Sequence, residues 1–180
     1  GRPALVDVFA DAEEVELFLN GTSLGRKPAG EAHDFTASYE LSYEPGQLTA
    51  VSYTDGKEIG RNTLLTAGNE VQLCAAADRT VLAADGEDLA FISIHLADSE
   101  GRENLFATKT ISVSVDGAGR LEAFGSADPR SLRSYDDTEG ETYDGYVMAV
   151  VRAGETEGMI HVLVSAEGCS DQSIEIEVRR

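Results

Sequence analysis

Residues 15–25 read VELFLNGTSLG, and this stretch decides the fold. Every second residue from Val15 to Leu19 is apolar, so a β-strand here has one apolar face. Asn20 and Gly21 follow, and both residue types tolerate the positive φ that a type I′ turn requires at its two central positions. The stretch therefore predicts a β-hairpin, which is a scaffold element rather than a catalytic one.

The rest of the chain repeats this pattern of short alternating strands. Apolar alternation recurs at intervals near ten residues, with turns such as Pro45-Gly46 and Asp55-Gly56 between the strands. No window of ten or more residues keeps an apolar face at helical period, which excludes an α/β barrel and a doubly wound sheet. The predicted fold class is all-β, with two consecutive immunoglobulin-like β-sandwich domains.

The strand pattern pauses at Thr66-Ala67-Gly68-Asn69, and we expect the domain boundary there. The expected domains are residues 1–67 and 68–180, each long enough to bury its own core. A single barrel over all 180 residues is the alternative.

The charge of the chain is strongly negative. Its 33 acidic residues outnumber 14 basic ones, and the net charge is -19. Such a surface repels nucleic acid and anionic membrane faces, so neither is an expected partner. No apolar run approaches the ~20 residues that a membrane span needs. Because the first residues are Gly1-Arg2-Pro3, without a starting Met or a signal peptide, we interpret the chain as a piece of a longer protein.

The sequence predicts no metal site and no cofactor. The three histidines, His33, His95 and His161, are too scattered for a zinc site. Residues 136–141 are rich in oxygen atoms but lack the spacing of a calcium loop, which indicates a solvated acidic loop. Cys74 and Cys169 fall on strands that can be neighbours in a sandwich, so they are either two buried thiols or a disulfide.

The order of several short motifs resembles one enzyme family over nearly the whole chain. In the first half these motifs are Val15 to Gly21, Tyr43-Glu44-Pro45-Gly46-Gln47-Leu48, Tyr53-Thr54-Asp55-Gly56-Lys57-Glu58 and Thr66-Ala67-Gly68. In the second half they are Ala77-Asp78-Arg79-Thr80, Ala84 to Leu89, Gly117-Ala118-Gly119-Arg120-Leu121 and Asp128-Pro129. The first half resembles the domain after the catalytic barrel of family 2 glycoside hydrolases of β-galactosidase type, and the second half resembles their last domain.

This resemblance implies a bacterial parent enzyme of carbohydrate metabolism that hydrolyses terminal β-galactosides or a related glycoside with two carboxylates in a barrel. Every matched motif lies downstream of that barrel, so we expect no catalytic centre in this chain. The expected partner is the catalytic barrel of the parent, and another subunit is a further candidate. A secreted or cell-associated enzyme is favoured.

The strand pattern lapses in residues 125–145, which are too long for a hairpin loop. Their aromatic, apolar and basic side chains favour an ordered contact loop, whose candidate residues are Asp128, Arg130, Leu132, Arg133, Tyr135 and Tyr143. The loop would contact either another domain or subunit, or a glycan. The second case corresponds to the alternative function, an autonomous glycan-binding or cell-surface adhesion module. The absence of Trp disfavours it, because sugar platforms rely on flat aromatic faces.

Overall fold

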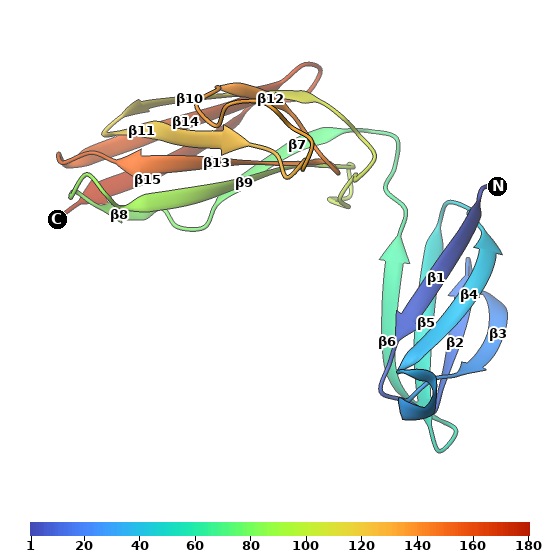
Figure 1. Ribbon diagram of the computed structural model, residues 1–180. Helices are drawn as coiled ribbons and strands as arrows, with labels where there is room; N and C mark the ends of the chain where they lie inside the picture. The colour runs from blue at the N-terminus through green and yellow to red at the C-terminus, as the bar shows by residue number, and fades with distance from the viewer. The chain divides into compact units, whose positions relative to one another are not determined.

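The computed structural model describes all 180 residues, and they form two compact units, residues 1–66 and 67–180. Both units consist of β-strands, as Figure 1 shows, and the only helical element is the 3₁₀ turn Glu31–His33. No helix is long and apolar enough to cross a membrane. The predicted all-β fold of immunoglobulin-like sandwiches is therefore confirmed.

Residues 1–66 form two antiparallel sheets that face each other. The strands are β1 (Pro3–Phe9), β2 (Glu14–Leu19), β3 (Thr22–Pro28), β4 (Thr36–Ser42), β5 (Gln47–Thr54) and β6 (Lys57–Leu65). One sheet pairs β1 with β4, and the other has the order β3-β2-β5-β6. The alternation of β2 buries Val15 and Leu17 between the sheets, against Ala37 and Tyr39 of β4.

The hairpin predicted from residues 15–25 is present. Asn20 and Gly21 have φ of 50° and 81°, as a type I′ turn requires. The Asn20 side chain also reaches the turn before β5, because its Oδ1 accepts a 2.8 Å hydrogen bond from the Gln47 N–H. This asparagine therefore ties two turns together.

Tyr39 makes a buried polar contact in this unit. Its side chain is 2 % exposed, and its hydroxyl donates a 2.6 Å hydrogen bond to the carbonyl oxygen of Val15. Burial raises the pKa of this phenol above its usual range. The hydroxyl therefore remains protonated, and a donor, at neutral pH.

Tyr39→Phe is expected to lower the free energy of unfolding of residues 1–66 by about 1 kcal/mol, because a buried hydrogen bond is lost while the ring still fills its place. Urea unfolding followed by circular dichroism measures this change. Tyr43→Phe is the control in the same unit, since that side chain is 43 % exposed and should change stability by less than about 0.5 kcal/mol. Equal effects of the two substitutions would contradict the role of the Tyr39 hydroxyl.

Residues 67–180 form a larger sandwich. Its strands are β7 (Gln72–Ala77), β8 (Val81–Ala83), β9 (Leu89–Ala97), β10 (Thr110–Gly117), β11 (Gly119–Gly125), β12 (Glu139–Glu141), β13 (Tyr146–Ala153), β14 (Gly158–Ala166) and β15 (Gln172–Arg179). They build a five-stranded sheet, β12-β10-β14-β15-β8, and a four-stranded sheet, β11-β13-β9-β7. All pairs are antiparallel except β8 with β15.

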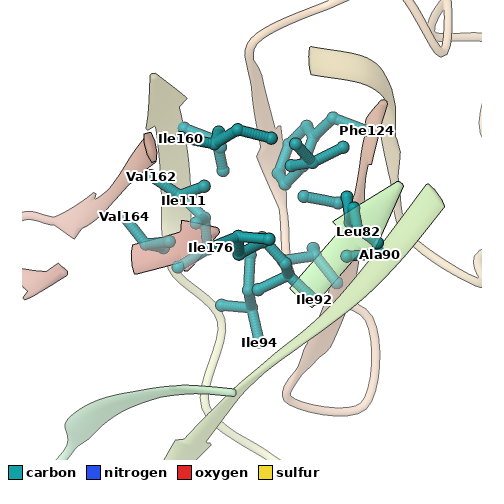
Figure 2. Close-up of a cluster of buried hydrophobic side chains, with 14 of the residues drawn as sticks. Leu82, Ala90, Ile92, Ile94, Ile111, Phe124, Ile160, Val162, Val164 and Ile176 are labelled. Carbon is teal, nitrogen blue, oxygen red and sulfur yellow. The ribbon is translucent and has the colours of Figure 1, made fainter. Parts of the chain in front are cut away.

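The core of this unit lies between its two sheets. Figure 2 shows Ile92 and Ile94 of β9 meeting Ile111 of β10 and Ile176 of β15. All four side chains are fully buried. The alternating apolar residues of β9, β10 and β15 thus form one continuous apolar layer. Burial of this layer is the main source of stability of residues 67–180.

Cys74 and Cys169 are both free thiols in the structure. The Cys169 Sγ instead donates a 3.5 Å hydrogen bond to the carbonyl oxygen of Val71. Of the two interpretations that the sequence left open, the structure supports separate thiols.

Candidate functional site

The segment after β11 is more ordered than the sequence pattern indicated. Residues 125–145 were expected to be one long loop, but they contain the short strand β12, which pairs with β10. Tyr143 and Tyr146 form a further backbone bridge. The missing signal has a physical reason: β12 is only three residues long, too short for alternation to show.

Backbone hydrogen bonds hold this segment to its neighbours. The Phe124 N–H donates to the carbonyl oxygen of Tyr135 over 2.8 Å. Buried Thr142 receives a 3.1 Å hydrogen bond on Oγ1 from the Lys109 N–H and donates its own N–H back to the Lys109 carbonyl. In Figure 1 the segment lies at the same end of this sandwich as the loop between β9 and β10.

Arginines neutralise acidic groups within the segment. The Arg130 N–H and Nε each donate a 3.0 Å hydrogen bond to Oδ1 of Asp128. The Arg130 guanidinium holds the pKa of the Asp128 carboxyl below its usual range. Arg133 donates a 2.6 Å hydrogen bond from Nη1 to the carbonyl oxygen of Glu139. Both predicted cations therefore order the segment itself.

A pocket of about 340 Å³ lies within the segment. It is lined by Phe124, Gly125, Ser126, Asp128, Ser131, Leu132, Arg133, Ser134, Tyr135, Glu139, Gly140, Glu141, Thr142 and Tyr143. Five of the six candidate contact residues are thus brought together, and Arg130 alone is not part of the lining. Most of the lining surface is polar.

An apolar groove of about 400 Å³ lies on the other side of Tyr135, over the outer face of β11, β13 and β9. Its lining includes Phe124, Tyr146, Met148 and Val150. The Tyr135 ring lies on Gly125, where a Cβ atom would come within 2.8 Å of it. Gly125 therefore makes room for this tyrosine, which forms a wall shared by the pocket and the groove.

Several apolar side chains at this end of the sandwich are exposed to solvent. Leu132 is fully exposed, Phe106 is 92 % exposed and Tyr135 is 68 % exposed. Tyr146 is more sheltered and stacks on His95 with ring centroids 5.4 Å apart. Burial, together with the nearby Glu103 carboxylate, raises the pKa of Tyr146 to about 12. The phenol is therefore neutral at physiological pH and offers an uncharged aromatic surface.

Sequence reasoning missed the groove residues Met148 and Val150. The alternation of β13 indicates that they share a face with Tyr146, but nothing local shows that this face is left open. The same reasoning missed Phe106, which stands alone in a turn-rich stretch. No group of three or more His, Cys, Asp or Glu side chains lies where it could hold a metal ion.

Comparison with known proteins identifies the family. Residues 73–175 match the family described as glycoside hydrolase family 2 C-terminal domain 5, and residues 1–60 match a domain of unknown function, DUF4982. The first match covers more than half of the chain. The chain therefore belongs to the C-terminal, non-catalytic region of family 2 glycoside hydrolases, as its resemblance implied.

Individual relatives agree with this assignment. Beta-galactosidase BoGH2A of Bacteroides ovatus is 26 % identical over 93 % of this chain and 20 % of its own length. A crystal structure of a family 2 member from Bacteroides cellulosilyticus is 37 % identical with a TM-score of 0.95, over 100 % of this chain and 23 % of that one. A family 2 beta-glucuronidase, 20 % identical with a TM-score of 0.88, shares the fold over 99 % of this chain and 19 % of its own.

The chain spans between a tenth and a fifth of the length of the curated relatives that it matches. In those proteins the matching region is a small part of a longer family 2 polypeptide.

Proposed function

We propose that this chain is the C-terminal accessory region of a bacterial glycosidase that hydrolyses terminal β-galactosides or a related β-glycoside. The match to beta-galactosidase BoGH2A over 93 % of the chain carries this proposal. In the parent, residues 1–67 would follow the catalytic barrel and residues 68–180 would form the last domain. The two catalytic carboxylates would lie in the barrel, about 5 to 5.5 Å apart as in retaining glycosidases.

Activity assays test this proposal directly. The full-length polypeptide should hydrolyse nitrophenyl β-galactoside, or the matching β-glucuronide if the parent acts on that sugar, while this chain alone should hydrolyse neither. Turnover that co-purifies with the isolated chain would contradict the accessory role. A full-length polypeptide without any glycosidase activity would contradict the proposed parent.

We further propose that the segment 125–145 contacts another part of the parent, either its catalytic barrel or a second subunit. Two exposed side chains support a protein contact: Leu132, which lines the pocket, and Tyr135, which also lines the apolar groove of about 400 Å³. Aromatic side chains are enriched in the buried cores of protein interfaces. A fully exposed leucine such as Leu132 adds no buried apolar contact to its own domain, but it would add one to an interface.

The charges favour a protein over a glycan as the occupant. A glycan needs carboxylates that are free to accept hydrogen bonds from its hydroxyls. Asp128 already accepts three hydrogen bonds from Arg130, and Oε1 of Glu139 accepts a 2.9 Å hydrogen bond from Ser112. Of the carboxylates that line the pocket, this leaves Glu141 to accept from a glycan. Glycan binding through Tyr135 and Tyr143 remains the second candidate, because both tyrosines line the pocket.

Replacing Leu132 and Tyr135 together by Ala should weaken domain docking in the full-length polypeptide at least tenfold, measured as lost subunit assembly or lost thermal protection of the barrel. Leu163→Ala is the matched control, because it removes a 42 % exposed leucine from β14, outside the pocket and the groove. Loss of galactan binding by the chain, with assembly intact, would instead identify a glycan site. No change in either measurement would contradict both.

A further inference from the structure

The backbone that connects the two units is held by hydrogen bonds on both sides of one residue. On the side of residues 1–66, the Thr66 N–H donates to the carbonyl oxygen of Gly46 over 2.8 Å. The Thr66 Oγ1 accepts a 3.0 Å hydrogen bond from the Gly46 N–H in return. Thr66 is therefore the last residue fixed to the first unit.

On the side of residues 67–180, Asp98 holds the chain. Its Oδ2 accepts a 2.8 Å hydrogen bond from the Gly68 N–H. Its Oδ1 accepts 2.9 Å hydrogen bonds from the Glu100 and Arg102 N–H groups. The Asp98 side chain is 2 % exposed, so it is locked in the turn after β9 while it binds a residue 30 positions away in the sequence.

Ala67 is the single residue between these two attachments, and it makes no backbone hydrogen bond. We propose that Ala67 is the joint between the two units and that Asp98 is the positioning residue which limits the joint to this one residue. The Gly68 carbonyl oxygen also accepts a longer, 3.4 Å hydrogen bond from the Asn104 Nδ2. Without the Asp98 carboxylate, this exposed bond alone would hold residues 67–70, and they would form a flexible connection four residues long. The sequence Thr66-Ala67-Gly68-Asn69 by itself suggests such a flexible linker. In the structure, by contrast, hydrogen bonds hold both Thr66 and Gly68.

The hydrogen bonds of Asp98 explain why a carboxylate suits this position. It accepts three backbone N–H groups, and the Arg102 Nη1 lies 3.5 Å from its Oδ2. The Gly68 N–H and then the Arg102 N–H hold the pKa of this carboxyl below its usual range. The carboxylate is therefore charged at neutral pH, and its hydrogen bonds to N–H groups are charge-assisted.

Limited proteolysis of the whole chain tests the proposal. With a protease of low specificity, the wild-type chain should be resistant at residues 66–70, and Asp98→Ala should raise the cleavage rate there about tenfold. Asp98→Asn should give a smaller increase, because one carboxylate oxygen is replaced by an amide nitrogen that cannot accept. Nuclear spin relaxation should show the two units of Asp98→Ala tumbling more independently than in the wild type.

Asp85→Ala is the matched control. Asp85 also accepts two backbone N–H groups, from Glu87 and Asp88, but it lies in a different turn of the same unit. It should leave cleavage at 66–70 unchanged. Equal cleavage there in Asp98→Ala and the wild type, with both folded by circular dichroism, would overturn the proposal.

A second variant covers the case in which Asp98→Ala destabilises its unit. Thr66→Val removes the hydroxyl from the other side of the joint without touching residues 67–180. It should also raise cleavage at 66–70 by several fold, with the melting temperature of the second unit unchanged. Resistance of this variant equal to that of the wild type would count against a one-residue joint.

Discussion

Ile92→Ala is expected to lower the free energy of unfolding of residues 67–180 by about 2–5 kcal/mol. Ile92 is fully buried in the layer seen in Figure 2, so the change removes apolar contact and leaves a cavity in a close-packed core. Denaturant unfolding followed by circular dichroism measures the loss.

Leu163→Ala is the control for this prediction, because it removes the same number of carbon atoms from a 42 % exposed position on β14 and should cost much less. Because the two units have separate cores, Ile92→Ala should also leave the unfolding of residues 1–66 unchanged. Equal losses for the two variants would contradict the assignment of the core.

Gly117→Ala is expected to destabilise the same unit by about 2–4 kcal/mol. Gly117 has φ of 90°, which an alanine adopts only with strain, and an added Cβ would collide with the carbonyl oxygen of Met159 on the paired strand β14. That oxygen accepts the Ala118 N–H, so it cannot move away without losing a hydrogen bond.

Gly101→Ala separates backbone strain from the collision. Gly101 has a similar φ of 78°, but no atom lies within 4 Å of an added Cβ. Its substitution should cost only the strain, about 1–2 kcal/mol. A melting-temperature shift for Gly117→Ala no larger than that for Gly101→Ala would contradict the steric argument.

Local sequence patterns predicted the turns well, because their geometry depends on adjacent residues. The positive φ values of Asn20-Gly21 and Asp55-Gly56 follow from side chains that tolerate this conformation. The same holds for the alternation of β9 and β10, whose apolar positions became core. These regularities also carried the resemblance to family 2 glycoside hydrolases, which the family match confirmed.

The candidate site was predicted only in part. The composition of residues 125–145 indicated an ordered segment with Leu132 and Tyr135, and the structure brings both to one pocket. The composition of residues 125–145 did not indicate the other residues that line the groove. Met148 and Val150 belong to β13, whose outward-facing residues show no unusual sequence pattern. The composition also did not indicate that Arg130 donates a hydrogen bond to Asp128 within the segment.

The sequence by itself determined the all-β class, the hairpin turns, the two apolar patterns that become two cores and the family. Each of these depends on residues close together in the chain or on the order of short motifs. Only the tertiary structure decided that Tyr135 lies on Gly125, that the two cysteines stay apart and that Asp98 holds Gly68. Each of these features involves two residues that are 10 to 95 positions apart in the sequence. The distance between them in space is set by how the sheets pack rather than by any local pattern.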